Sequence, residues 1–263
     1  MHRLKAVLFD IDDTLLDWSM RQQTWEDQEW EHLNRVYDYV DQHVHPLHNR
    51  DHFFEDTLGY IIEHWQVAKR TFRAPHLGQA LVESLVAQGV PREAIDMTAC
   101  LHAYGAEAFP GLRPYPEVPA VLEALQARGL RLGLITNSIR PMHMREIELR
   151  QTGLWAYFEA DGCGISAADI GYIKPHAAIF RAALARLSVT PEEAVFVGDS
   201  LKADISGAQG VQMRAILRQL PNPAVYADFA APPGIQPDGV ITSLDELLPL
   251  LDEFYPAQQD GNI

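Results

Sequence analysis

Cysteine is scarce in this sequence. Only Cys100 and Cys163 occur among the 263 residues, and their isolation excludes the paired spacing of a zinc site or a disulfide framework. Two separate thiols are typical of proteins from a reducing compartment. We therefore expect a cytoplasmic protein.

Positive charge is also limited. Lysine and arginine number 21 against 36 acidic residues, which gives a net charge of −15. A general nucleic-acid binder needs a basic face for the phosphate backbone, so this class of function is excluded. Any site for a phosphate group must be locally positive in an acidic protein.

Long apolar runs are missing as well. No stretch approaches the roughly 20 apolar residues of a membrane-spanning helix. The first predicted strand begins within a few residues of Met1, so we expect neither a signal peptide nor a membrane partner. The sequence leaves the oligomeric state open.

The most informative stretch is KAVLFDIDDTLLD at residues 5–17. The apolar run 7–9 predicts a buried strand, which should end where the acids begin. Asp10 and Asp12 are two residues apart and therefore lie on one side of an extended chain. Such carboxylates repel each other unless a cation or a proton intervenes, and Mg²⁺ prefers oxygen ligands of this kind. The alternative is a solvated acidic turn.

Residues 18–112 follow a helical pattern. Apolar side chains recur at three- and four-residue spacing, which predicts a helical bundle inserted behind the first strand. The stripes are Trp30, Leu33, Tyr37 and Val40; Phe54, Leu58, Ile61, Ile62 and Trp65; and Met97, Leu101, Tyr104 and Ala108.

From residue 113 onward, predicted strands alternate with helices. Further strands are expected at 130–135, 157–160, 194–197, 213–217 and 239–241, and a Pro-rich loop at 218–238. This alternation indicates a doubly wound parallel sheet. The predicted fold class is α/β, with a Rossmann-like core (1–17 and 113–263) and an inserted all-α helical domain (18–112).

Polar residues gather where the predicted strands end. Asp10, Thr136 and Asp199 each follow a strand directly, and ligands of parallel sheets bind beyond the carboxyl ends of the strands. Lys174 precedes a proline, a position that avoids helix, so it should lie in a loop before the next helix. We expect these four residues to meet at one edge of the sheet.

Four segments of the chain carry these residues: Asp10-Ile11-Asp12-Asp13-Thr14, Thr136-Asn137, Lys174-Pro175, and Gly198-Asp199-Ser200 with Asp204. In order, spacing and context they resemble the haloacid dehalogenase superfamily, in its phosphatase branch. FDIDDTLLD is most similar to the nucleotidase-like and acylneuraminate-phosphatase-like members. The resemblance implies the core strand order 5-4-1-2-3. It also implies that residues 18–112 form a C1-type cap, which closes over the site and helps to select the substrate.

The resemblance further implies a mechanism. Asp10 would attack phosphorus to form an aspartyl-phosphate, and Asp12 would act as general acid and base. The implied Mg²⁺ ligands are Asp10, Asp12 through its backbone carbonyl, and Asp199, with Ser200 and Asp204 in support. The implied phosphate-binding residues are Thr136, Asn137 and Lys174. In dehalogenase members the acid at the position of Asp12 is replaced, so dehalogenation is not expected here.

These inferences favour a Mg²⁺-dependent phosphatase acting on a small phosphorylated metabolite, such as a nucleoside monophosphate or a sugar phosphate. A phosphomutase would share the nucleophile and the acid. A phospho-acceptor signalling module is less favoured, because such a module has neither an acid at the position of Asp12 nor a large helical insert. A non-catalytic phosphate-binding protein is also less favoured, because the full set of motifs is intact.

Two features of the predicted cap invite other interpretations. His43, His45, His48 and His52 could hold a second metal, but a polar surface loop is the favoured interpretation. Trp18 lies just behind the nucleophile segment. Of the four tryptophans in the cap it is therefore the strongest candidate for a role at the site rather than in the bundle core.

Overall fold

The computed structural model describes residues 3–220 and 233–256. At its centre is a six-stranded parallel sheet with the order β5-β4-β1-β6-β7-β8. Numbered 1 to 6 along the chain and read from the β8 edge, these strands run 6-5-4-1-2-3, so the expected order 5-4-1-2-3 is confirmed, with β8 as one further strand at the edge. The strands are β1 Ala6–Phe9, β4 Arg131–Thr136, β5 Gly164–Ser166, β6 Ala194–Gly198, β7 Arg214–Arg218 and β8 Gly239–Ile241.

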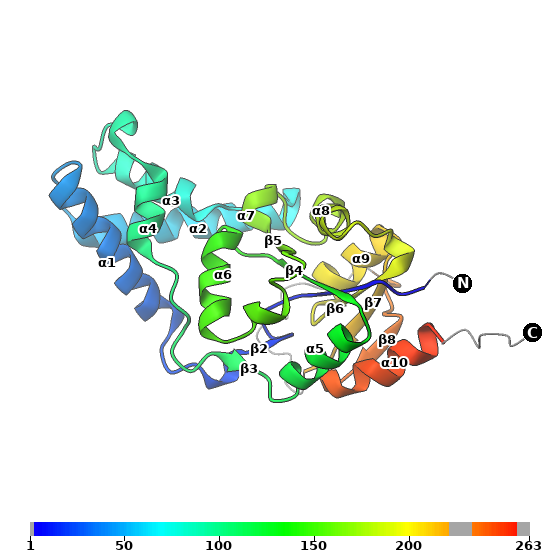
Figure 1. The fold of residues 1–263 in the computed structure, drawn as a ribbon. Helices are drawn as coiled ribbons and strands as arrows, with labels where there is room; N and C mark the ends of the chain where they lie inside the picture. Colours follow the sequence, from blue (N-terminus) through cyan, green and yellow to red (C-terminus); the bar gives the residue numbers. More distant parts are fainter. Residues whose placement is uncertain (1–2, 221–232, 257–263) are drawn as a thin grey trace, which may run out of the picture.

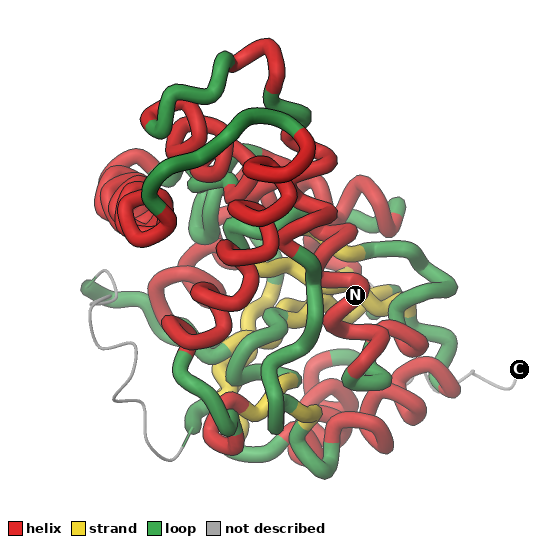
Figure 2. The backbone as a smooth tube through the Cα atoms, turned by 90° about the vertical axis from the view of Figure 1, so that its left-hand side faces the viewer, coloured by secondary structure: helices red, strands yellow, loops and turns green. Residues whose placement is uncertain are grey.

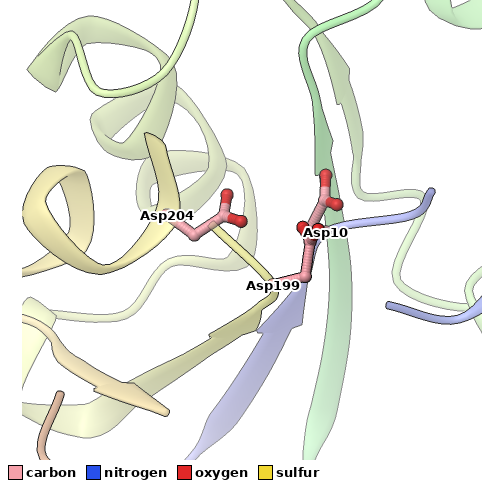
Figure 3. A group of neighbouring side chains, drawn as sticks. All are labelled: Asp10, Asp199 and Asp204. Carbon is pink, nitrogen blue, oxygen red and sulfur yellow. The ribbon is translucent and has the colours of Figure 1, made fainter. Parts of the chain in front are cut away.

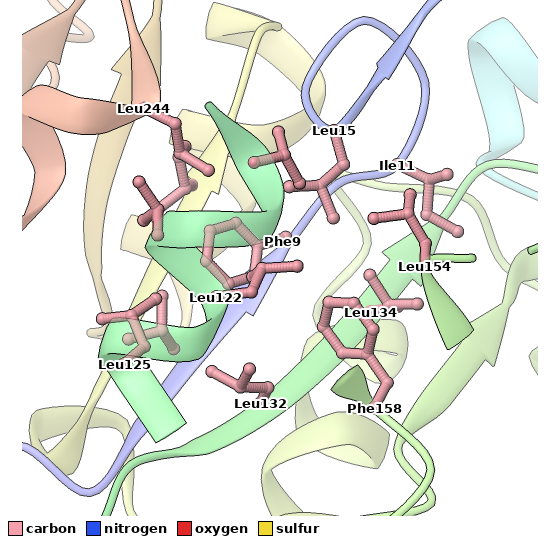
Figure 4. Packing of buried hydrophobic residues seen from close by; sticks show 14 of the residues in the cluster. Phe9, Ile11, Leu15, Leu122, Leu125, Leu132, Leu134, Leu154, Phe158 and Leu244 are labelled. Atoms are coloured by element: carbon pink, nitrogen blue, oxygen red, sulfur yellow. The ribbon is translucent and has the colours of Figure 1, made fainter. Parts of the chain in front are cut away.

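Helices cover both faces of this sheet, as predicted (Figures 1 and 2). Successive side chains of a strand point to opposite faces. Val7 and Phe9 therefore pack into one apolar cluster, and Ala6 and Leu8 into another. The first face is covered by α5 (Val118–Ala127), α6 (Met142–Gln151) and α10 (Leu247–Phe254), and Figure 4 shows Phe9 within this layer. The second is covered by α7 (Ala167–Ile170), α8 (Ala177–Leu187) and α9 (Ser206–Gly210).

Four α-helices between β2 (Leu16–Asp17) and β3 (Arg113–Pro114) form the expected helical insert, at the upper left of Figure 1. They are α1 Trp25–His43, α2 Arg50–Thr71, α3 Leu77–Ala87 and α4 Met97–Tyr104. The insert has an apolar core of its own, which includes Leu33, Leu81 and Tyr104. The Thr24 hydroxyl caps α1 by accepting the Asp27 N–H at 3.1 Å.

The two ends of the insert meet in a small antiparallel ribbon. In it, β2 (Leu16–Asp17) pairs with β3 (Arg113–Pro114). Elsewhere the insert is bonded to the core through the backbone: the Leu77 N–H donates to the Ile139 carbonyl at 2.8 Å, and the Ile173 N–H donates to the Phe72 carbonyl at 2.9 Å. We keep the domain boundaries at 17/18 and 112/113 as a proposal.

Short helical turns complete the described chain. They are η1 Trp18–Met20, η2 Arg92–Ala94, η3 Trp155–Tyr157, η4 Pro191–Glu193, the π-helix η5 Leu201–Ile205, and η7 Leu244–Glu246. Most of the predicted Pro-rich loop lies outside the described residues.

The strand predicted at 157–160 is wrong. Trp155 and Phe158 are both buried, and their three-residue spacing suits a helical turn, in which the Phe158 N–H donates to the Trp155 carbonyl at 2.9 Å. The strand at this edge is β5, where Ile165 lies opposite Ile135.

Two details of the helical insert also differ from prediction. The third stripe does not reach Ala108, because α4 ends at Tyr104 and the next residue, Gly105, has a φ of 84°, which is incompatible with a right-handed helix. The face of α2 that packs inward carries Phe53, Thr57 and Ala68, whereas Ile62 of the predicted stripe is 53% exposed.

Candidate active site

The nucleophile candidate and the loop lysine are in direct contact. Asp10 follows β1, and its Oδ1 lies 2.5 Å from Lys174 Nζ. Lys174 also donates to the Ile135 carbonyl at 3.1 Å, and its Nζ lies 2.7 Å from Asp204 Oδ1. Burial by itself lowers the pKa of the Lys174 ammonium, but the carboxylates of Asp10 and Asp204 raise it above its usual value. The lysine therefore remains charged inside the protein.

Asp10, Asp199 and Asp204 form a cluster of acids beyond the ends of β1 and β6 (Figure 3). Each offers an oxygen, and these oxygens lie within 4.8 Å of one another. Burial raises the pKa of Asp10 and of Asp199, and repulsion between the neighbouring carboxylates raises both further. The Lys174 ammonium lowers both pKa values but does not cancel the increase, so a further cation would favour the charged form of the cluster.

The cluster fits a divalent cation. Three carboxylates and one ammonium leave a net charge of −2. Within the described residues, Asp204 Oδ1 receives no aligned hydrogen bond, although it lies near Lys174 Nζ. Carboxylate oxygens are the ligands that Mg²⁺ prefers.

Backbone packing fixes the position of Asp204. A Cβ at Gly198 would lie 2.5 Å from the Asp204 carboxyl carbon, so only glycine leaves room for this acid. The Ser200 N–H donates to Asp204 Oδ2 at 2.9 Å, while the Ser200 hydroxyl accepts the Ala203 N–H and caps η5. In this structure Ser200 therefore acts on Asp204 through its backbone.

The Thr136-Asn137 segment lies beside the lysine, as expected from the sequence. Thr136 ends β4 with a buried side chain. Asn137 has a contact that differs from the predicted one: its Oδ1 accepts the Lys174 N–H at 2.6 Å, and its Nδ2 donates to the Lys174 carbonyl at 3.3 Å. The amide of Asn137 is therefore engaged with the backbone of Lys174 in this structure, and its predicted contact with a phosphate group stays a prediction.

Asp12 lies apart from the acid cluster and has its own partners. Its Oδ1 accepts hydrogen bonds from Trp18 Nε1 at 2.9 Å and from Arg145 Nη2 at 2.8 Å. Asp13, expected to be a turn residue, has a φ of 59°, a left-handed conformation that aspartate tolerates better than most residues.

Sequence reasoning missed Arg145. A signal was present, since Arg145 and Glu148 are charged residues at three-residue spacing on a helix whose other buried side chains include Met144 and Leu149.

A buried polar contact joins the helical insert to the loop after β4. Arg140 Nη2 lies 2.9 Å from Glu29 Oε1 on α1 and 3.1 Å from the Tyr104 hydroxyl on α4. The same hydroxyl donates to Glu29 at 2.6 Å. All three residues are at least nine-tenths buried.

The histidines of the insert do not gather into a group of three potential metal ligands in the described part of the chain. Over residues 3–220 and 233–256, the three aspartates are the only group of potential metal ligands that lie so close together. His52 instead lies 3.5 Å from Asp56, and His45 faces the Pro46 carbonyl. None of the helices in these ranges is long and apolar enough to span a bilayer.

The fold and the site define a class: a doubly wound α/β protein with a carboxylate and lysine site at the carboxyl ends of its strands and a helical insert after the first strand. The chain belongs to the family of haloacid dehalogenase-like hydrolases, whose family model matches residues 4–212.

Named relatives of the chain are phosphatases. Glyceraldehyde 3-phosphate phosphatase of Pyrococcus furiosus is 30% identical over 253 residues, covering 96% of this chain and 95% of the relative. Ribulose-1,5-bisphosphate 5-phosphatase of Halopiger xanaduensis is 29% identical over 215 residues, covering 81% and 83%.

Solved structures share the fold across nearly the whole chain. A HAD phosphatase from Thermococcus onnurineus has a TM-score of 0.56 and 28% identity, and covers 94% of this chain and 98% of its own. A 2-haloacid dehalogenase from Pseudomonas syringae pv. Tomato has a TM-score of 0.59 and 28% identity, and covers 95% and 99%.

Proposed function

We propose that this protein is a Mg²⁺-dependent phosphatase that hydrolyses a small phosphomonoester through an aspartyl-phosphate on Asp10. The observation that carries the proposal is the meeting of Asp10, Asp199, Asp204 and Lys174 beyond the strand ends. Family membership and the phosphatase relatives support it. Asp12 argues against a dehalogenase, since the acid at this position is replaced in dehalogenase members.

In the first half-reaction a carboxylate oxygen of Asp10 forms a bond to phosphorus while the bond from phosphorus to the leaving oxygen breaks. Asp12 gives its proton to that oxygen. In the second half-reaction water attacks phosphorus, Asp12 takes a proton from the water, and the bond to Asp10 breaks to release phosphate. Lys174 and Thr136 hold the phosphoryl oxygens, and Asn137 keeps the lysine in place.

The Mg²⁺ ligands in this proposal are Asp10 and Asp199, with the backbone carbonyl of Asp12. Asp204 and Ser200 support them. The cation supplies positive charge that offsets the charge of the phosphoryl group as it is transferred. The raised pKa values of Asp10 and Asp199 favour their protonated forms, so a cation held here would compete with protons for these carboxylates.

The helical insert and the relatives support a proposal for the substrate class. The insert is bonded to the loop that carries Lys174, which favours a small metabolite over a protein. We propose a sugar phosphate or a nucleoside monophosphate, and the relatives' names add glyceraldehyde 3-phosphate to the set to be tested. Neither a nucleic acid nor a membrane is part of this proposal, and the cytoplasmic location stays a prediction.

Phosphate release from a panel of phosphomonoesters, with Mg²⁺ or with a chelator, tests the proposal. We expect metal-dependent turnover by the wild-type protein and none by Asp10→Asn, which keeps the size of the side chain and removes the nucleophile. Asp161→Asn is a control, because this acid accepts the Leu132 N–H at 2.8 Å, far along β4 from Thr136. If folded wild-type protein with Mg²⁺ releases no phosphate from any compound, the phosphatase proposal fails. Isomer formation that depends on a bisphosphate would then favour a phosphomutase.

A further inference from the structure

The carboxylate of Asp12 is held at one of its two oxygens. Trp18 Nε1 and Arg145 Nη2 both donate to Oδ1, at 2.9 and 2.8 Å. The side chain is 32% exposed, so the carboxylate is fixed at one oxygen while it still reaches the solvent side of the site. Two donors on one oxygen restrict the rotation of the carboxyl group far more than a single bond would.

Arg145 is itself fixed from behind. Its Nη1 lies 2.9 and 3.1 Å from the two oxygens of Glu148, three residues further along α6. The two side chains are only 6% and 1% exposed. Burial by itself lowers the pKa of Arg145, but Asp12 and Glu148 raise it above its usual value, so the guanidinium stays charged. A planar guanidinium with a carboxylate on each side is a rigid donor.

Trp18 reaches Asp12 from the hinge of the helical insert. It directly follows β2, and its ring packs edge-to-face on Phe109 with the ring centroids 4.8 Å apart. Phe109 belongs to the segment that returns from α4 to β3. One donor to Asp12 therefore comes from a core helix, and the other comes from the point where both connections to the insert meet.

A buried ion pair adds little to stability by comparison with apolar side chains of the same size. The Arg145–Glu148 pair therefore needs another explanation, and among the described residues the hydrogen bond that it makes toward the site is the one to Asp12. We propose that Arg145, oriented by Glu148, is a positioning residue for proton transfer. With Trp18 it holds Oδ1 of Asp12, so that Oδ2 is the oxygen that delivers the proton to the leaving group.

This inference rests on the proposed phosphatase function and predicts how the rate depends on the leaving group. A nitrophenolate leaves without a proton, whereas an alkoxide needs one as its bond to phosphorus breaks. The ratio kcat/KM is suited to the test because it reports only the steps up to transfer of the phosphoryl group to Asp10. Damage to later hydrolysis of the aspartyl-phosphate does not affect it.

The experiment measures kcat/KM for p-nitrophenyl phosphate, phenyl phosphate and glycerol 1-phosphate in Mg²⁺, with wild type and Arg145→Lys. Because general acid catalysis contributes about 10²–10⁴-fold, we expect a loss of about 10–100-fold with glycerol 1-phosphate. The loss with p-nitrophenyl phosphate should be less than about 3-fold, with phenyl phosphate between the two. Arg150→Lys is the matched control on the same helix, since Arg150 pairs with Glu146 and Glu159 at the surface.

Trp18→Phe provides a second variant in case Arg145→Lys does not fold. It keeps an aromatic ring against Phe109 and removes only the N–H donor, so the same leaving-group trend should appear with a smaller amplitude. Equal losses with all three substrates, or no loss in either variant, would overturn the positioning role. Absence of wild-type turnover with every substrate would instead overturn the proposed function, which separates the two failures.

Discussion

The buried contact between Arg140 and Glu29 provides a strong test of how the helical insert is held on the core. We expect Glu29→Leu to lower the free energy of unfolding by about 3–5 kcal/mol, the usual cost of leaving one member of a buried ion pair without its partner. The side chains of Arg140 and Glu29 are only 8% and 9% exposed, so water cannot replace the lost carboxylate. The Tyr104 hydroxyl also loses its acceptor, which places the expected cost toward the upper end of this range.

A loss of this size is large for a protein whose total stability is about 5–15 kcal/mol. Urea unfolding followed by circular dichroism measures it, provided that the slope of the unfolding free energy against urea is unchanged. Glu107→Leu is the control. Glu107 pairs with Arg35 at 2.7 Å, but these side chains are 51% and 43% exposed, so we expect a cost of about 0–1 kcal/mol.

A double variant separates the pair from the packing around it. Arg140→Met in the Glu29→Leu background removes the unpaired charge, and apolar replacements of buried pairs are often neutral. The double variant should therefore be more stable than Glu29→Leu alone. If Glu29→Leu costs no more than Glu107→Leu, or if the double variant is the least stable of the set, the reasoning about the buried charge is refuted.

Two further predictions concern the acid cluster. In the metal-free protein the raised pKa values of Asp10 and Asp199 mean that the folded state keeps protons which the unfolded chain releases. The free energy of unfolding should therefore fall as the pH rises above the ordinary carboxyl range. In thermal melts, Mg²⁺ should raise the melting temperature more at pH 8 than at pH 6. An equal increase in melting temperature at the two pH values would contradict this. Gly198→Ala should weaken Mg²⁺ binding in calorimetric titrations and cost about 1–3 kcal/mol, because the added methyl group collides with Asp204. Gly59→Ala is the control: it adds a methyl group to α2 where nothing lies within 4 Å, and it should stabilise the protein by about 0.5–1 kcal/mol. Unchanged Mg²⁺ binding by Gly198→Ala would show that the contact with Asp204 is unimportant.

Much of the fold was predictable because its signals are local. A buried strand that ends in acids predicted β1, and Arg131–Thr136 ends at the expected threonine. Thr190 and Glu193 have the three-residue spacing of a capping box, another local signal, and in the structure both reciprocal bonds form at the start of η4. Residues 157–160 misled the prediction because the spacing of Trp155 and Phe158, not the local strand propensity, decides how that segment packs.

The meeting of the site residues was predictable for a different reason. Right-handed crossovers in a parallel sheet bring successive strand ends to one edge, so Asp10, Thr136 and Asp199 had to approach one another once the strands were identified. The individual contacts were not predictable. Asn137 faces the Lys174 backbone, and this orientation depends on a loop whose conformation no spacing rule specifies.

By itself, the amino-acid sequence determined the fold class, the helical insert and the set of acids and lysine at the strand ends. These features follow from hydrophobic periodicity and from the topology of parallel sheets. Only the tertiary structure decided that Arg145 and Trp18 bond to the same oxygen of Asp12. Those two residues lie far apart in the sequence. Their approach depends on how α6 and the hinge of the insert pack against the turn after β1, a long-range packing result that no local pattern encodes.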